Sequence, residues 1–145
     1  MTREQKDLLL KDLCGRLPYG IKGNFLNSDG SLSHDPLLRK VSITYSCLVT
    51  ADGNDGMVLN GDLKPYLFPL SSMTVEQRCK AQNLLPNKCE ISFINSKITF
   101  YGEDCCEIKL EQFDKLFKFF DSQHVDYRGL IPMGLAIDAT DQNIY

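Results

Sequence analysis

The sequence predicts an α+β fold in which three helices pack mainly on one face of an antiparallel sheet of about four to six strands. Three segments have the apolar spacing of amphipathic helices, and the strand-like segments come in turn-linked groups that do not alternate with helices. A doubly wound parallel sheet needs that alternation and is disfavoured. The 145 residues contain no internal repeat, linker or low-complexity tract. We therefore expect a single globular domain over residues 1–145.

The first helix is expected near the start of the chain. Thr2 and Gln5 have the spacing of a capping box, in which each side chain bonds the backbone of the other residue. Gly15 and Pro18 are expected to end this helix. Its predicted apolar stripe is Leu10, Leu13, Cys14 and Leu17.

The next part of the chain is predicted to form strands. Residues 19–26 make a first strand that leads into a turn at residues 27–31. Residues 41–49 form the clearest strand, because apolar side chains occupy the odd positions and hydroxyl groups most even ones. Residues 51–56 are a second turn, and residues 57–59 a short strand.

The second half begins with another capping box, Thr74 and Gln77, which predicts a helix ending near Leu84. Residues 89–94 and 97–101 then flank Asn95-Ser96 as a hairpin. A third helix follows, with its polar face carrying two oppositely charged pairs four residues apart. Its predicted buried stripe is Leu110, Phe113, Leu116, Phe117 and Phe120, and the pairs are Glu111–Lys115 and Asp114–Lys118.

Composition limits the possible function classes. Hydrophobic residues make up 43% of the chain and charged residues 24%, which is typical of a globular protein. The formal net charge is −3 and the basic residues are scattered, so a generic nucleic-acid binder is disfavoured. No apolar stretch approaches the ~20 residues of a membrane span. The first residues also lack the apolar core of a secretory signal. We expect a protein of the cytoplasm without a membrane partner.

The chain has six cysteines and two histidines. Without an export signal or a C-x-x-C spacing, reduced thiols that pack as small hydrophobic side chains are expected. His34 and His124 are far apart, so no metal site is predicted. The turn at residues 52–56 does not fit an EF-hand loop. No nucleotide or catalytic motif is present, and no cofactor is expected.

Residues 64–74 contain two prolines and predict a stiff, non-helical crossing. Two interpretations are open for its apolar side chains. Tyr66, Leu67, Phe68 and Leu70 either cover one end of the core or form an apolar ledge for a partner.

The segment after the third helix concentrates His124, Asp126, Tyr127 and Arg128 within five positions. These residues either anchor the tail or present a binding site. In the structural interpretation, Arg128 pairs with Asp126 or a helix-end carbonyl, and the Tyr127 ring packs on the core. Residues 131–134 suit a type I turn, and residues 135–137 a final strand.

Three segments of the chain carry a resemblance to a known family: residues 8–22, residues 64–74 and the string Asp126-Tyr127-Arg128-Gly129-Leu130-Ile131. They are similar to a family of short uncharacterised proteins encoded by gut anaerobic bacteria and by their prophages and other mobile elements. Many family members have two adjacent histidines in the tail, whereas this chain has Gln123 before His124. This difference weakens a histidine-pair metal site. The resemblance implies a genomic setting and no mechanism.

The leading functional hypothesis is a small non-catalytic interaction module, an adaptor or regulator of mobile-element origin, that binds another protein or itself. The first alternative is a small enzyme or ligand-binding protein with a site around His124, Tyr127 and Arg128. The second is a nucleic-acid-associated factor, which would require Arg39, Lys40 and Lys64 to cluster. The candidate binding surface is Tyr66, Phe68, His124, Asp126, Tyr127 and Arg128.

Overall fold

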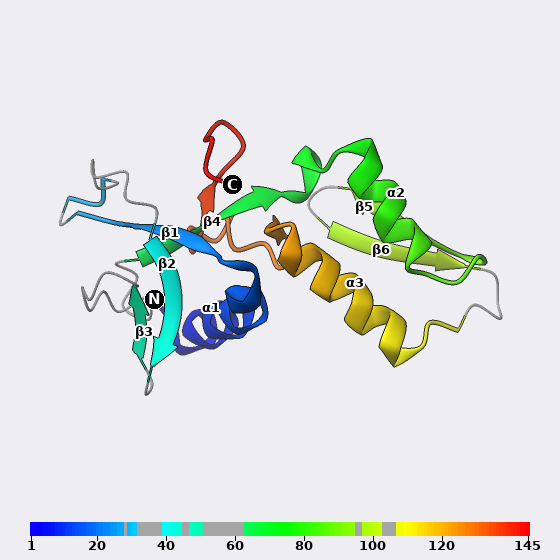
Figure 1. Ribbon diagram of the computed structural model, residues 1–145, viewed down its shortest axis with the longest axis horizontal. Coiled ribbons are helices and arrows are strands. Elements are labelled where there is room, and N and C mark those ends of the chain that lie inside the picture. The colour runs from blue at the N-terminus through cyan, green and yellow to red at the C-terminus, as the bar shows by residue number, and fades with distance from the viewer. Residues whose placement is uncertain (28, 32–38, 45–46, 51–62, 95–96, 103–106) are drawn as a thin grey trace.

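The computed structural model describes residues 1–27, 29–31, 39–44, 47–50, 63–94, 97–102 and 107–145. The helices are α1 (Arg3–Arg16), α2 (Val75–Asn83) and α3 (Leu110–Ser122). The strands are β1 (Lys22–Phe25), β2 (Arg39–Thr44), β3 (Cys47–Thr50), β4 (Leu63–Pro69), β5 (Cys89–Ile94), β6 (Lys97–Gly102), β7 (Val125–Asp126) and β8 (Ile137–Asp138). Helix α1 lies beside strands β1 to β4 at one end of an elongated molecule, and α2, α3, β5 and β6 form the other end (Figure 1). The predicted α+β class is confirmed.

The main sheet is mixed, which corrects the expectation of a wholly antiparallel sheet. Its strand order is β3-β2-β1-β4-β7, and β8 also pairs with β4. Strands β1 to β4 pair antiparallel, whereas β7 and β8 run parallel to β4. A parallel neighbour requires a long crossover connection. The segment containing α2, β5, β6 and α3 supplies it, so the chain returns beside β4 in the same direction.

The single strand predicted over residues 41–49 is also wrong. Strands β2 and β3 pair with each other, with Val41 opposite Thr50 and Thr44 opposite Cys47. An alternating pattern is equally compatible with one long strand and with two short strands that face each other. The turn and strand predicted within residues 51–59 lie outside the described residues.

Helix α1 has the predicted capping box between Thr2 and Gln5. Its buried face, however, consists of Leu9, Asp12, Leu13 and Arg16, and Cys14 is exposed. Asp12 and Arg16 lie four residues apart and pair with each other. Two charged side chains are therefore part of the buried face, which the apolar pattern of the sequence did not predict. Gly15 lies inside the helix, where it allows a close approach to α3. An added Cβ would lie 2.6 Å from Asp121 Oδ2.

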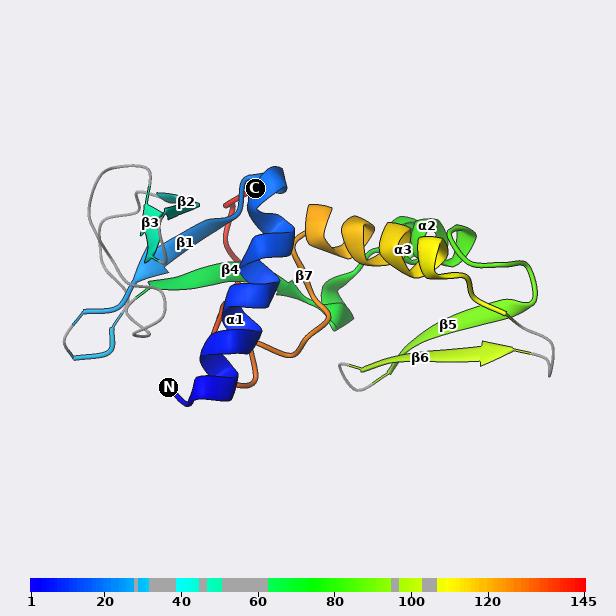
Figure 2. The same ribbon diagram turned by 90° about the horizontal axis from the view of Figure 1, so that it is seen from below.

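At the other end of the molecule, most of the elements predicted from the sequence are present. The Thr74–Gln77 capping box starts α2, and β5 and β6 form the expected hairpin as a separate two-stranded sheet. Helices α2 and α3 lie on the same side of that hairpin (Figure 2). Its core includes Leu70, Met73, Ala81, Leu85, Cys89, Leu116, Phe120 and Val125.

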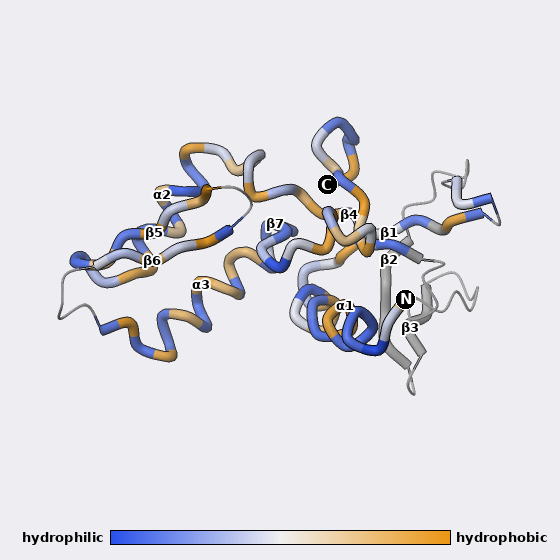
Figure 3. Tube along the Cα trace, turned by 180° about the vertical axis from the view of Figure 1, so that it is seen from behind, coloured by the Kyte–Doolittle hydropathy of each residue, from blue (hydrophilic) through white to orange (hydrophobic). Residues whose placement is uncertain are grey.

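Apolar and polar residues alternate along α3 in the way that an amphipathic helix requires (Figure 3). Leu116 and Phe120 are fully buried, Phe113 and Phe117 are half-buried, and Leu110 is 85% exposed. Leu110 thus departs from the predicted stripe because it stands on the first turn of the helix, ahead of the apolar contacts. The expected ion pairs Glu111–Lys115 and Asp114–Lys118 are present on the exposed side.

The cysteines differ from the sequence-based expectation. Cys14 and Cys79 are exposed free thiols, and Cys89 is buried and disulfide-bonded. The prediction that all six cysteines are reduced and buried is therefore wrong. Spacing rules exclude metal motifs, but they do not report which cysteines the fold brings together.

Among the described residues, no helix is both long and apolar enough to cross a bilayer.

The fold yields a stability prediction for α3. Phe120→Ala removes a fully buried ring that contacts Phe93, Phe117 and Tyr127. We expect the free energy of unfolding to fall by about 3–5 kcal/mol, measured by denaturant titration. Lys118→Ala, on the exposed side of the same helix, should change it by less than about 1 kcal/mol. Equal losses for the two variants would contradict this burial pattern.

Candidate functional site

The residues that follow α3 lie at the junction of the two ends of the molecule. The chain leaves α3 at Ser122 and enters β7 three residues later, at Val125, next to β4. His124 makes this reversal with a φ angle of 53°, in the left-handed region that few non-glycine residues adopt. The reversal turns the following side chains toward α1 and the end of α3.

The centre of this junction is the ion pair between Asp12 and Arg16 of α1. Arg16 Nε donates to Asp12 Oδ2 at 2.7 Å, and Arg16 Nη2 donates to Asp12 Oδ1 at 2.9 Å. Both side chains are 0% exposed. Arg16 Nη2 also donates to the carbonyl oxygen of Val125 at 2.8 Å. Burial is the largest single effect and by itself would lower the pKa of Arg16, but the hydrogen bond to Asp12 and the negative charges of Asp12 and Asp121 together raise it. Arg16 is thus a permanent cation that joins α1 to the tail.

Arg128 and Asp121 complete the cluster. Arg128 Nη1 donates to Asp12 Oδ1 at 2.7 Å and lies 3.7 Å from Asp121 Oδ1. The Tyr127 hydroxyl donates to Asp121 Oδ1 at 3.0 Å, and the Arg128 guanidinium lies over the Tyr127 ring at 4.4 Å. Burial raises the pKa of Asp121 and the pKa of Tyr127. Two carboxylates and two guanidinium groups therefore balance one another beside a neutral tyrosine.

This arrangement tests the expectations for the tail. The predicted partner of Arg128, Asp126 or a helix-end carbonyl, is wrong because Arg128 reaches Asp12 of α1. Asp126 instead accepts hydrogen bonds from the backbone N–H groups of Leu130 and Ile131, both at 2.8 Å. The Tyr127 ring packs on Phe117 and Phe120, as expected.

The end of the tail follows its predicted course. The turn over residues 131–134 is present, because Gly134 N donates to Ile131 O at 2.9 Å. The final strand, β8, begins two residues later than its predicted start. It returns the chain to β4.

His124 lies on the other side of β7. Its ring stacks on Tyr145 with a centroid distance of 4.0 Å. Burial and the nearby charge of Arg16 lower the pKa of His124 to about 4. The buried atom Nδ1 has no hydrogen-bond partner among the described residues. This histidine is neutral near pH 7 and is held against the C-terminal tyrosine.

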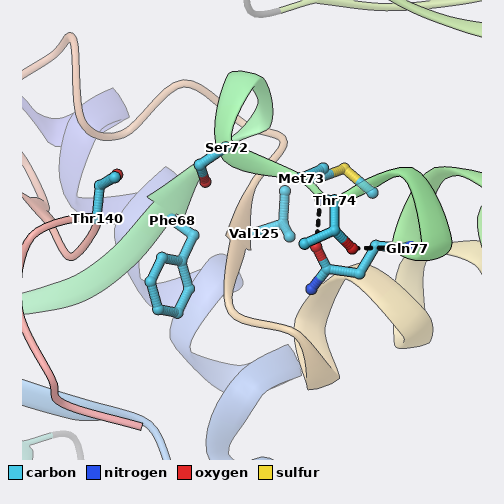
Figure 4. Close-up of a pocket in the computed structure, with 7 residues that line it drawn as sticks. All are labelled: Phe68, Ser72, Met73, Thr74, Gln77, Val125 and Thr140. Atoms are coloured by element: carbon cyan, nitrogen blue, oxygen red, sulfur yellow. Dashed lines mark hydrogen bonds between the residues drawn. The ribbon is translucent and has the colours of Figure 1, made fainter.

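Tyr66 and Phe68 occupy this second side as well. Tyr66 is buried, and its hydroxyl accepts a hydrogen bond from Asn24 at 3.1 Å. Phe68 is half-buried, with its ring 5.8 Å from that of Tyr145. It lines a small pocket of about 230 Å³ together with Ser72, Met73, Thr74, Gln77, Val125 and Thr140 (Figure 4). Five of the six candidate residues thus divide into two groups, with Tyr66, Phe68 and His124 in one and Tyr127 and Arg128 in the other. The sixth, Asp126, binds the backbone of the loop after β7.

A larger groove opens beside Tyr127 and Arg128. It has a volume of about 620 Å³ and lies between β6, α3 and the loop after β7. It is lined by Lys97, Ile98, Phe100, Phe117, Tyr127, Arg128, Gly129, Pro132 and Met133. The side chain of Arg128 is 21% exposed, so this residue belongs both to the buried cluster and to the wall of the groove.

Sequence reasoning missed Asp12, Arg16 and Asp121. The available signal was the Asp12–Arg16 spacing of four residues, in which each charged residue is followed by a leucine, Leu13 or Leu17. A charged pair in register with an apolar stripe points toward the interior. No local pattern connects that pair with residues 121–128, because the contact spans more than 100 residues, as the separation of 109 between Arg16 and Val125 shows.

No family model matches the chain, and no curated protein or solved structure matches it either. Among the described residues, no group of three or more histidine, cysteine or acidic side chains could hold a metal ion. The chemistry of the site follows from its geometry, which combines a closed charge-neutral cluster inside with a largely apolar groove outside.

The buried cluster yields a stability prediction. Asp12→Ala removes the carboxylate that binds both Arg16 and Arg128 and leaves Arg16 buried without its main partner. We expect the free energy of unfolding to fall by about 3–5 kcal/mol. Asp7→Ala removes an exposed carboxylate from the same helix and should change it by less than about 0.5 kcal/mol. If Asp12→Ala is as mild as Asp7→Ala, the cluster does not hold the tail.

The pKa of His124 yields a pH prediction. Its folded-state pKa of about 4 lies below the unfolded value of ~6.5. The unfolded chain therefore binds a proton more readily, so stability is full above pH 6.5 and falls as the pH drops toward 4. The loss should approach about 1.4 kcal/mol for each pH unit.

The matched variant for this measurement is His124→Asn, because asparagine tolerates the left-handed backbone and does not titrate. Denaturant unfolding of both proteins between pH 4 and pH 7 should show a shallower acid dependence for the variant. Parallel pH curves would assign the acid sensitivity to other groups.

Proposed function

We propose that the chain is a small non-catalytic protein-interaction module, and that its partner binds in the groove between β6, α3 and the loop after β7. The observation that carries this proposal is that Arg128 takes part in both the buried cluster and the wall of the groove. One of its terminal nitrogens is bound to the buried Asp12, and the residue also lines the groove. The polar groups at the junction hold the fold together, while the surface beside them remains open.

The polar cluster supports a structural role over a catalytic one. A general base must be able to accept a proton near neutral pH. His124 is buried, with a pKa lowered to about 4, and the raised pKa of Tyr127 makes it a weak acid. Asp121 is engaged by the Tyr127 hydroxyl, and Asp12 by both arginines. These groups are partners of one another before any substrate arrives.

The groove supports an interaction role. Its aliphatic and aromatic walls come from three separate elements, and Met133 stands at its rim with 47% exposure. Exposed methionine side chains are common on surfaces that accept a partner, because they adapt to different shapes. Tyr66 is buried in the core and is not available to a partner. The proposed binding surface is therefore the groove and not the proline-containing segment of residues 64–74.

The second candidate function is a small-ligand-binding protein. The groove volume of about 620 Å³ lies within the usual range of ligand sites, and Tyr127 and Arg128 supply polar groups there. His124 belongs to the opposite side of β7, so a ligand in the groove would contact Tyr127 and Arg128 without it. A ligand site would tolerate changes at the exposed rim better than a protein interface would.

The adaptor or regulator role of mobile-element origin and the cytoplasmic location are proposals that rest on the sequence. The disulfide at Cys89 counts against a reducing compartment. Because Cys89 is buried, alkylation of the protein unfolded in denaturant without reductant, followed by mass spectrometry, distinguishes the two. A modified Cys89 would support the cytoplasm, and an unmodified Cys89 beside modified Cys14 and Cys79 would support an oxidising location.

The test of the proposed function is affinity capture from the native host with wild-type protein and two exposed variants. Met133→Glu places a charge at the rim of the groove, and Leu110→Glu places the same charge at an exposed apolar position outside it. We expect a protein partner that binds the wild type and Leu110→Glu but is lost with Met133→Glu. A partner that is lost equally with both variants, or retained with both, would exclude the groove as its binding site.

A further inference from the structure

The β5–β6 hairpin has two edges, and α2 covers one of them. Gln82 of α2 binds the backbone of β5 with its side-chain amide: Nε2 donates to Cys89 O at 2.7 Å, and Oε1 accepts from Ile91 N at 3.0 Å. The amide thus bonds one carbonyl and one N–H of the strand, as the backbone of a neighbouring strand would. The backbone groups of β5 that face away from β6 are accordingly bonded at these two positions.

The opposite edge, along β6, has no such cover in the described part of the chain. The groups of Cys89 and Ile91 face away from β6, so the pairing groups of β5 belong to Glu90, Ser92 and Ile94. Their partners in the register are Tyr101, Thr99 and Lys97. Because successive residues of a strand direct their backbone groups to opposite sides, the N–H and C=O groups of Ile98, Phe100 and Gly102 form the outer edge.

No described residue pairs with that outer edge, since the hairpin is a separate two-stranded sheet. The outward-facing strand also belongs to the wall of the groove, because Ile98 and Phe100 line it. Unpaired edge strands beside apolar pockets are used to bind extended peptides: main-chain hydrogen bonds hold the peptide, and the pockets select its side chains.

The charges in the groove specify the partner further. The charged residues among its lining are Lys97 and Arg128, both cationic. The carboxylate of Asp12 already balances the charge of Arg128. This bond uses only Nη1 of Arg128, and neither Nε nor Nη2 donates a hydrogen bond to a described residue. Arg128 therefore offers free donors, and Lys97 offers net positive charge. An acidic side chain complements both.

We propose that the partner contributes an extended segment that adds to the outer edge of β6. Apolar side chains of this segment enter the groove against Phe100 and Phe117, and an acidic side chain meets Lys97 and Arg128. This inference rests on the proposed function and specifies what the groove binds. A helical partner would leave the backbone groups of Ile98, Phe100 and Gly102 unused.

The experiment selects ligands for the full-length protein from a library of random linear 12-residue peptides. Enriched peptides should contain an acidic residue close to alternating apolar residues. When one such peptide is added, amide hydrogen exchange should slow at Ile98, Phe100 and Gly102. Lys97→Glu should weaken binding by about fivefold or more. Lys80→Glu, an exposed lysine on α2 outside the groove, should change it by less than about twofold.

Three results would overturn the inference. The first is selection of peptides that bind without slowing exchange at β6 or without sensitivity to Lys97→Glu. The second is a failure to select any peptide. The third is a concentration-dependent dimer, detected by sedimentation, that protects the β6 amides without added peptide, because a second copy would then occupy the edge. In the first two cases the proposed function can still hold. It would be supported by a protein that the wild type captures from the host and that Met133→Glu fails to capture.

Discussion

The ion pair between Asp12 and Arg16 lies where α1, the end of α3 and the tail meet. Removing two charges from water costs several kcal/mol per ion, and a buried pair only recovers this cost when its remaining donors and acceptors are also bonded. Here Asp12 receives a second arginine and Arg16 Nη2 binds the Val125 carbonyl, but Arg16 Nη1 is buried without a hydrogen-bond partner among the described residues. The pair thus adds little net stability by itself, but any other arrangement of the tail would leave a charge buried without a partner. Its main effect is to select one docking position, which in turn fixes β7 beside β4 and sets the wall of the groove.

The close approach that this cluster needs is built into the backbone of α1. At Gly15 the absence of a Cβ leaves room for Asp121, whose carboxylate would otherwise be 2.6 Å from that atom. A glycine in a helix interior costs roughly 1 kcal/mol relative to alanine. That local loss is tolerated because it brings Asp121 within 3.8 Å of Arg16. The helix is thus locally less stable than its sequence could make it, in exchange for contact with α3.

Local signals in the sequence were sufficient for most of the local structure. Both capping boxes, the β5–β6 hairpin and the exposed ion pairs of α3 depend on residues within a few positions of one another, and all were predicted. The buried face of α1 was not predicted, because Asp12 and Arg16 look like surface residues until their distant partners are known. The parallel pairing of β7 and β8 with β4 is likewise long-range. The division of residues 41–49 into two strands is local, and it was missed because an alternating pattern fits one long strand and two short facing strands equally well. For the candidate site, the sequence identified Tyr127 and Arg128 as special, but it could not distinguish an anchor from a groove wall.

The parallel pairing of β4 with β7 and β8 has a consequence for the order of folding. Strand β4 lacks these two neighbours until residues 125–138 have been made, because α2, the hairpin and α3 all precede β7. The segment from α2 to α3 supplies most of one apolar cluster, which also includes Leu70, Met73 and Val125, and its contacts are mostly local. Local contacts form early in folding. During synthesis, this later segment can therefore assemble while the earlier half of the chain still waits for the tail. The part of the sheet that is synthesised first is therefore completed last. Until then, Leu67 of β4 lacks the cover of the loop that carries Leu130 and Leu135.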